Sequence, residues 1–182
     1  MKSFLIRPAL ALALAAGLAA CGGSDKAEFT VAGSVQNLLY PGLKLVNNGG
    51  ETIDIAPPAK AGDAVTYAFP TKLEYGDTYN VQIPVGGQPA HQTCTLNSNY
   101  PTNSDTAGRL AQIDIQFACS LNVFGIGGTV SGLTAEGLVL ANGSTGGTAT
   151  LAKDATSYTF SLPVAYGQTY GVTVLTQPTG LT

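Results

Sequence analysis

Apolar and polar residues alternate along most of the chain, which is typical of strands that bury one face. Phe29, Val31 and Val35 form the first such set, with polar or small residues between them. Turn residues interrupt the alternation, as at Asn47-Asn48-Gly49-Gly50 and Pro57-Pro58. Strands are therefore predicted around residues 29–36, 43–45, 53–55, 65–69, 79–83, 94–96 and 113–119. Short strands separated by regular turns predict an all-β fold of the β-sandwich type.

The second half of the chain repeats the pattern of the first. The segment YAFPTKLEYGDTYNVQI at residues 67–83 returns 91 residues later as YTFSLPVAYGQTYGVTV at residues 158–174. Before this segment the offset is 95, as between Asn47 and Asn142, and after it the offset falls to 89. Two short length changes in loops explain this drift, because loops tolerate them. The repeat predicts two tandem modules, residues 29–120 and residues 121–182.

The second module is expected to be incomplete. At an offset of 89, the counterpart of Cys94 would fall at position 183, and the sequence has 182 residues. The last two strands of the module would then be missing, and its sheet edges would be unpaired. We therefore expect the sequence to be a fragment of a longer protein. The alternative is a natural incomplete module that a strand from another chain completes.

Each repeat carries the same turn motif, with a glycine three residues after an apolar residue and three residues before a tyrosine. The motif comprises Leu73, Gly76 and Tyr79 in the first repeat, and Val164, Gly167 and Tyr170 in the second. It resembles the tyrosine corner of fibronectin type III and related immunoglobulin-like domains, and the same stretch also resembles prealbumin-like modules of bacterial surface proteins. The resemblance implies immunoglobulin-like β-sandwich modules, in which Gly76, Tyr79, Gly167 and Tyr170 are structural corner residues.

The N-terminal residues are typical of an export signal. Lys2 and Arg7 precede an apolar run over residues 9–20 that is too short to span a bilayer. Its end, Leu18-Ala19-Ala20-Cys21, resembles the lipobox of bacterial lipoproteins. The resemblance implies that residues 1–20 are a lipoprotein signal peptide and that Cys21 is acylated, with palmitate among the chains. Residues 21–28 would then form the anchor and a short tether. The alternative is an ordinary signal peptide cut near Ala20, which leaves a free thiol.

The lipoprotein resemblance also accounts for the odd number of cysteines. With Cys21 assigned to lipid, Cys94 and Cys119 remain as a pair in an oxidising compartment. We therefore expect a disulfide between them, and the alternative is two buried free thiols. The residue after Cys21 is Gly22 and not Asp, which by resemblance to enterobacterial sorting favours the outer membrane over the inner membrane. The predicted location is the cell envelope.

Charge excludes one class of partner. The net charge is −3, and removal of Lys2 and Arg7 with the leader would make it about −5. The remaining basic residues are spread along the chain, whereas binding to phosphate backbones needs clustered Lys and Arg. We therefore expect no nucleic-acid partner. The membrane, reached through acylated Cys21, is the partner that the sequence predicts.

The sequence predicts neither catalytic residues nor a metal or cofactor site. His91 is the only histidine, and no acidic residue lies near it at a ligand spacing. The carboxylates are scattered, without the Asp-x-Asp-x-Asp spacing of a calcium loop. Tyr75 and Tyr166 precede the corner glycines, where stacking on a sugar is an alternative to corner packing. We therefore expect no enzyme activity in these residues.

The repeats also resemble tandem modules in lipoproteins and secreted proteins of Gram-negative bacteria, and residues 126–180 match that style closely. The resemblance implies a lipid-anchored cell-envelope protein with a structural, adhesive or binding role, whose ligand would be a protein or a glycan. One alternative is the anchoring region of an envelope enzyme whose catalytic domain lies downstream. Another alternative is a carbohydrate-binding module, which a glycan array would test.

Overall fold

The protein is all-β. The computed structural model describes residues 27–100 and 102–180, and these residues form strands, turns and loops but no helix. The strands of the N-terminal part are β1 (Glu28–Gln36), β2 (Leu43–Asn47), β3 (Glu51–Ile55), β4 (Val65–Glu74), β5 (Thr78–Gln82), β6 (Gln92–Leu96), β7 (Ser104–Thr106) and β8 (Ile113–Leu121). They are followed by β9 (Val123–Phe124), β10 (Gly127–Thr129), β11 (Leu138–Asn142), β12 (Thr148–Leu151), β13 (Ser157–Thr159), β14 (Val164–Ala165) and β15 (Val172–Thr176).

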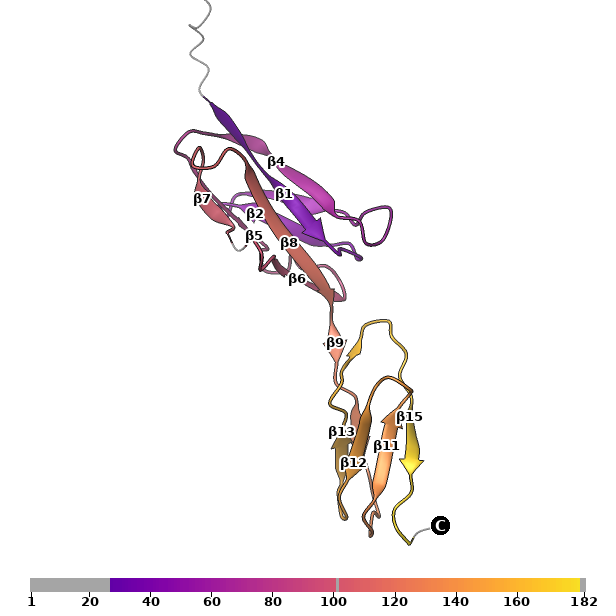
Figure 1. The fold of residues 1–182 in the computed structure, drawn as a ribbon. Helices are drawn as coiled ribbons and strands as arrows, with labels where there is room; N and C mark the ends of the chain where they lie inside the picture. The colour runs from indigo at the N-terminus through magenta and orange to yellow at the C-terminus, as the bar shows by residue number, and fades with distance from the viewer. Residues whose placement is uncertain (1–26, 101, 181–182) are drawn as a thin grey trace, which may run out of the picture.

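Strands β1 to β8, here called the first unit, form two sheets. One sheet has the order β4-β1-β8-β6 and the other has the order β3-β2-β5-β7. Neighbouring strands are antiparallel except β1 and β8, which run parallel from the pair Val31–Ile113 to the pair Gln36–Ala118. The first strand of the unit therefore lies beside its last strand, at the centre of one sheet (Figure 1).

The core of the first unit lies between these two sheets, as in a β-sandwich. The alternating positions of β1, β2, β5 and β8 turn inward, so their apolar side chains are buried and their polar neighbours are more exposed. The side chains that are less than 2% exposed are Phe69, Leu38, Leu43, Leu45, Ile115, Val31, Val35, Val81 and Cys94. The expected alternation of strands with one buried face is thus confirmed for this unit.

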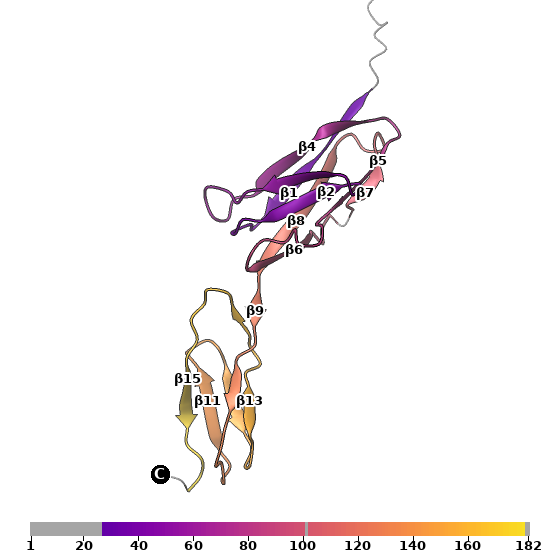
Figure 2. The ribbon, with the colours of Figure 1, turned by 180° about the vertical axis from the view of Figure 1, so that it is seen from behind.

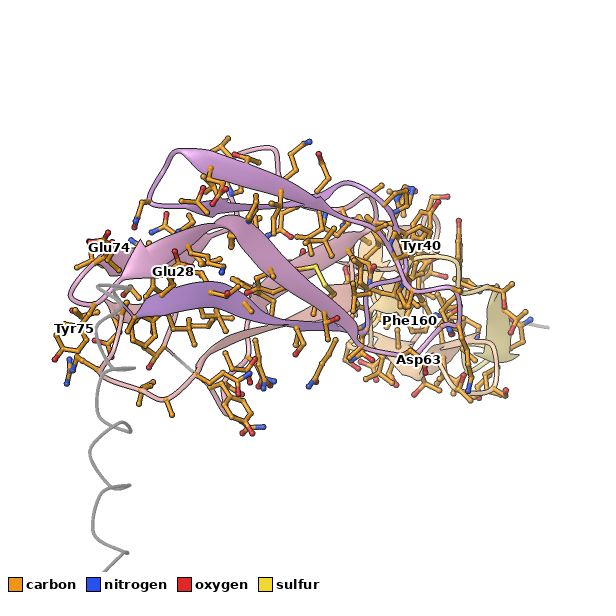
Figure 3. All side chains as sticks on the ribbon, turned by 90° about the horizontal axis from the view of Figure 1, so that it is seen from above. Glu28, Tyr40, Asp63, Glu74, Tyr75 and Phe160 are labelled. Atoms are coloured by element: carbon orange, nitrogen blue, oxygen red, sulfur yellow. A yellow bond between two sulfur atoms is a disulfide. The ribbon has the colours of Figure 1, made fainter. Side chains whose placement is uncertain are left out.

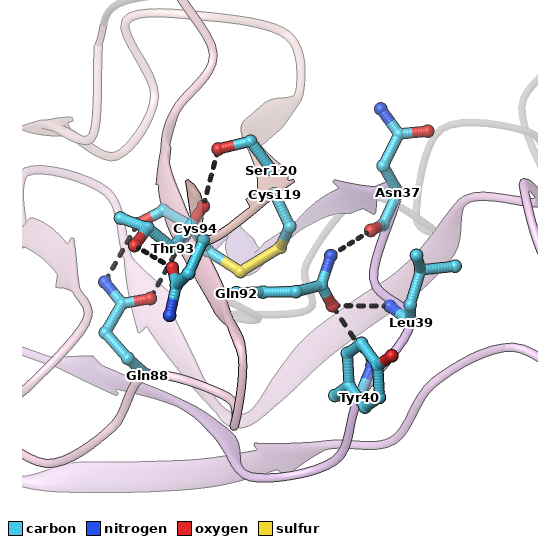
Figure 4. Close-up of a disulfide and its surroundings, with 10 residues drawn as sticks. Asn37, Leu39, Tyr40, Gln88, Gln92, Thr93, Cys94, Cys119 and Ser120 are labelled. Atoms are coloured by element: carbon cyan, nitrogen blue, oxygen red, sulfur yellow. Dashed lines mark hydrogen bonds between the residues drawn. A yellow bond between two sulfur atoms is a disulfide. The ribbon is translucent and has the colours of Figure 1, made fainter. Parts of the chain in front are cut away.

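The predicted disulfide between Cys94 and Cys119 is present. The two residues face each other on β6 and β8, neighbouring antiparallel strands of one sheet, and both are buried in the core (Figure 4). The conserved disulfide of antibody domains instead joins two sheets. The bond therefore links two neighbouring strands within one layer of the sandwich.

Strands β10 to β15, here called the second unit, are arranged in smaller sheets. The order β12-β11-β15 makes one sheet and β10 pairs with β13 in another, while β14 pairs with β9. A separate core holds them together, formed by the buried residues Leu133, Leu138, Leu140, Ala149, Leu151 and Phe160. The two units lie end to end, with β9 between them (Figures 1 and 2).

The same contacts recur in both units at the offsets found in the sequence. The side-chain oxygen of Asn47 accepts a hydrogen bond from the backbone N–H of Asn80 at 3.1 Å, and Asn142 accepts one from Gly171 at 3.0 Å. Gly33 pairs with Tyr67 across β1 and β4, as Gly128 pairs with Tyr158 across β10 and β13. The following aromatic pairs also match: Tyr67–Phe69 has ring centroids 6.1 Å apart at 88°, and Tyr158–Phe160 has them 5.8 Å apart at 88°.

Candidate functional site

The segment that joins the two units is the most distinctive site in the described part of the chain. We call this segment, residues 122–124, together with Tyr40, His91 and residues 164–166 beside it, the junction. Strand β8 ends at Leu121 and β9 begins at Val123, so a single residue separates them. Strand β9 then pairs with β14 of the second unit, Val123 with Ala165 and Phe124 with Val164. A strand that leaves the first core thus enters the sheet structure of the second unit almost without a linker.

Asn122 is bonded to both units through its backbone. Its N–H donates to the carbonyl oxygen of His91 in the first unit at 2.9 Å, and its own carbonyl accepts from the N–H of Tyr166 in the second unit at 2.8 Å. Its side-chain oxygen also accepts from the Thr93 hydroxyl at 2.8 Å. With both backbone groups occupied by opposite units, this residue is held in place instead of serving as a flexible hinge.

Three aromatic rings pack across the junction. The rings of His91 and Tyr166 are stacked, with centroids 3.6 Å apart and planes 5° from parallel. Tyr40 meets both rings edge to face, at 5.4 Å from His91 and 5.7 Å from Tyr166. An aromatic pair contributes about 0.5–1.5 kcal/mol beyond the area that it buries. The cluster therefore adds a specific contact between the units to the backbone bonds of Asn122.

Gln92 fixes the backbone beside two of these rings, those of Tyr40 and His91. This side chain is 2% exposed, and its oxygen accepts from the backbone N–H groups of Leu39 at 2.7 Å and Tyr40 at 3.0 Å. Its amide nitrogen donates to the Asn37 carbonyl at 2.8 Å (Figure 4). Because Gln92 follows His91 directly, its buried amide connects the loop that carries Tyr40 to the backbone of His91.

The ring cluster lies at one end of the first unit. Its residue Tyr40 and the exposed Tyr75 lie at opposite ends of that unit (Figure 3).

The structure places the four predicted corner residues differently in the two units. Gly76 and Gly167 both have positive φ, 94° and 80°, which favours glycine at that turn. Tyr79 is 4% exposed in the first core, whereas Tyr170 is 67% exposed. The reason is local: Tyr79 lies within β5, between β2 and β7, but the equivalent strand β15 begins only at Val172. The tyrosine of the second unit is therefore not packed as its counterpart is.

Cys21, the predicted lipidation site, lies outside the described residues, as do the predicted signal peptide and most of the predicted tether. Residues 27–100 and 102–180 contain no helix that is long and apolar enough to cross a bilayer. In the same ranges no group of three or more His, Cys, Asp or Glu side chains is placed to hold a metal ion.

Burial shifts the ionisation of two tyrosines in the first core. Burial, with a smaller contribution from the charge of Asp114, raises the pKa of Tyr67 far above its usual value. Burial and the nearby Asp105 also raise the pKa of Tyr79, partly offset by Arg109. On the surface, the hydrogen bond and charge of Glu28 raise the pKa of Lys72. The two tyrosine shifts come mainly from burial and therefore reflect core packing, whereas the Lys72 shift reflects an ion pair on the surface.

Comparisons of the chain with protein-family models, with curated proteins and with solved structures found no match.

Proposed function

We propose that this protein is a lipid-anchored spacer of the bacterial cell envelope, built of two tandem immunoglobulin-like modules that hold a binding surface at a set distance from the membrane. The junction carries this proposal. A spacer needs units that keep their relative orientation, and a backbone bonded to both units together with a ring stack across them supports that property. The end-to-end arrangement in Figures 1 and 2 provides the length.

The matching contacts of the two units support their origin as copies of one module. Equivalent asparagines, glycine–tyrosine pairs and ring pairs are retained at offsets of 95 and 91 residues. Duplication lengthens a protein without a new fold, since each copy carries its own core. The lipobox ending at Cys21 supplies the anchor, and the few residues between it and β1 keep the first unit close to the membrane.

The proposal is tested by measuring how narrowly the distance between the two units is distributed. Spin labels are placed at the exposed positions Lys60→Cys and Lys153→Cys in a chain with Cys21→Ser, and pulsed electron resonance gives the distance distribution. We expect one narrow peak. Tyr166→Ala removes the stack on His91 and the edge contact with Tyr40, so the peak should broaden about twofold while both units stay folded.

Tyr170→Ala is the matched control, because this tyrosine lies four residues away, is largely exposed and makes no ring contact among the described residues. Its distribution should equal that of the parent chain. A broad distribution in the parent chain would contradict a spacer, since the units would then move independently.

A further inference from the structure

An exposed tyrosine lies at the end of the first unit that points away from the second unit. Tyr75 is in the turn between β4 and β5, and its side chain is 74% exposed. Strand β1 begins at the same end, because Glu28 pairs with Glu74 across β1 and β4. In Figure 3 these three residues lie opposite Tyr40, which belongs to the junction. The start of the described chain and an exposed aromatic ring thus share one end of the unit.

Two loops at this end are joined into one surface. The Gly76 N–H in the β4–β5 turn donates to the Ala107 carbonyl in the β7–β8 loop at 3.1 Å. The Tyr75 ring lies against Gly108 of that loop, where a Cβ atom would come within 2.3 Å of the ring. Leu110, two residues farther along, is 56% exposed. We call residues 74–77 and 105–110, together with Glu28 and Lys72 beside them, the tether end.

The equivalent tyrosine of the second unit is a contact residue. Tyr75 and Tyr166 lie 91 residues apart at the same position of the repeat, and each precedes a glycine with positive φ. Tyr166 is half-buried, because it stacks on His91 of the first unit with ring centroids 3.6 Å apart. The tyrosine at this position of the second unit thus contacts the body that precedes its unit. Tyr75 faces away from the second unit, which follows at the other end (Figure 1).

The length of the tether indicates which body lies beside the tether end. This step rests on the proposed lipid anchor at Cys21. The described chain begins at Ala27, six residues after Cys21. Six residues span at most about 20 Å when fully extended. The lipid surface that holds the anchor is therefore within reach of Tyr75 and Leu110.

The charges of the tether end favour a shallow contact through apolar surface. Its charged side chains, which sum to a negative charge, are Lys72, Arg109, Glu28, Glu74, Asp77 and Asp105. Lys72 pairs with Glu28 at 2.8 Å, and Arg109 pairs with Asp105 at 2.9 Å. Attraction to anionic lipid therefore does not drive the contact, and the matching surface is zwitterionic. Tyrosine suits such a surface, because its ring is apolar and its hydroxyl stays among the polar headgroups.

We propose that the tether end is a lipid-contact surface, in which Tyr75 and Leu110 enter the headgroup region of the membrane that anchors Cys21. Burying apolar area there is favourable by about 25 cal/mol for each Å² removed from water. The tether makes the contact intramolecular, so a contact that is weak on its own is still populated. Tyr75 then orients the first unit on the membrane as Tyr166 orients the second unit on the first.

The test uses tryptophan fluorescence. The chain contains no tryptophan, so Tyr75→Trp introduces a single probe at this position. The acylated chain is reconstituted into phosphatidylcholine vesicles, with or without bromine on the acyl chains near the headgroup, and the vesicles are collected by sedimentation. We expect blue-shifted emission and at least twofold quenching by the brominated lipid. Adding Leu110→Asp should reduce the quenching by at least half, because a carboxylate is costly to move into the interface.

Two matched variants serve as controls. Tyr170→Trp places the probe on the second unit at a position that is 67% exposed, and it should not be quenched. Val85→Asp, combined with Tyr75→Trp, adds the same charge at a fully exposed residue after the opposite end of β5, and it should leave the quenching unchanged. Melting curves establish that each variant is folded.

The outcomes separate this inference from the proposed anchor. If the chain sediments with the vesicles and the probe at position 75 is not quenched, the lipid contact is overturned while the anchor stands. If the chain does not sediment with the vesicles, the anchor fails and the lipid contact fails with it. If the Cys21→Ser chain without vesicles shows the same blue shift as its concentration rises, a second copy covers the tether end and the lipid contact is overturned.

Discussion

At the scale of single residues, the clearest feature is a buried tyrosine that reaches across the sheet. Tyr67 extends from β4 over Gly33 of β1 and donates its hydroxyl proton to the Ile115 carbonyl of β8 at 2.9 Å. Its ring meets Phe69 edge to face. One side chain therefore connects three adjacent strands and contributes both apolar area and a satisfied polar group.

Tyr67 should make the first unit sensitive to alkali. Its pKa is raised in the folded state, so the unfolded chain ionises first, near pH 10, and stability is lost as pH rises from there. Tyr67→Phe should cost about 1 kcal/mol at pH 8 and reduce the loss of stability between pH 8 and pH 11. Urea denaturation at the two pH values measures both effects.

Tyr75→Phe serves as the control for this experiment, since its side chain is 74% exposed and should change neither value. An equal loss of stability with pH in the Tyr67→Phe variant and the parent chain would show that other groups cause the alkaline transition. Tyr79 has a raised pKa as well, so part of the slope should remain.

Residue burial was predictable where alternation alone decides it. The inward positions of β1 and β8 follow directly from a period of two, and Val31, Val35, Ile113, Ile115 and Phe117 are buried as expected. Tyr170 shows the limit of this reasoning. It has the same spacing as Tyr79, but its burial depends on where β15 begins and on which strands lie beside it. The spacing of the motif residues does not predict where the strand begins or which strands lie beside it.

At the scale of elements, the β6–β8 pair is the stapled part of the first unit. Cys94 and Cys119 face each other in its ladder, and Gln88 adds bonds from its side chain to the backbone N–H and carbonyl of Cys94 at 2.8 and 2.9 Å. The loop that the disulfide closes spans 25 residues. It contains β7, whose polar residues Ser104–Thr106 pair with β5.

Removing this disulfide should destabilise one unit selectively. Closing a loop of this length stabilises a fold by about 3.5 kcal/mol through the entropy of the unfolded chain. The paired change Cys94→Ala and Cys119→Ala should therefore lower the free energy of unfolding of the first unit by about that amount. The second unit has its own core, so hydrogen exchange of Leu138, Leu140 and Leu151 should be unaffected. Equal deprotection of both units would show that they unfold together.

Two kinds of short strand escaped prediction for the same physical reason. No strand is predicted between residues 96 and 113, yet β7 forms there by backbone pairing to β5. Strands β9 and β14 have two residues each and exist because they pair with each other across the junction. These short strands do not bury one face in a core, so the sequence shows no alternation of apolar and polar residues that would predict them.

At the scale of the whole molecule, the two cores are separate and the connection between them is short. The offsets of 95 and 91 residues anticipated which contacts recur, because equivalent residues make equivalent bonds. The junction itself was not anticipated. Tyr40 and His91 lie 51 residues apart in the first unit and Tyr166 lies in the second, and no local pattern indicates that their rings meet. Relative placement of units depends on such nonlocal contacts.

Cys21 should determine where the whole molecule resides. If it carries the acyl chains that the lipobox implies, the chain expressed with its leader in a Gram-negative host will sediment with membranes and require detergent for release. Cys21→Ser should move at least nine-tenths of it into the soluble fraction. The Cys94→Ala and Cys119→Ala variant, which keeps Cys21, should stay with the membranes. Retention of the Cys21→Ser chain in the membrane fraction would argue against lipid anchoring.

The parallel pairing of β1 with β8 has a mechanical consequence for a tethered protein. Tension between the start of β1 and the end of β8 pulls these neighbours in opposite directions along their common axis. The load then falls in shear on all six residue pairs from Val31–Ile113 to Gln36–Ala118 at once, and not on one pair after another as in peeling. A sandwich loaded in this way resists extension until the ladder ruptures as a whole.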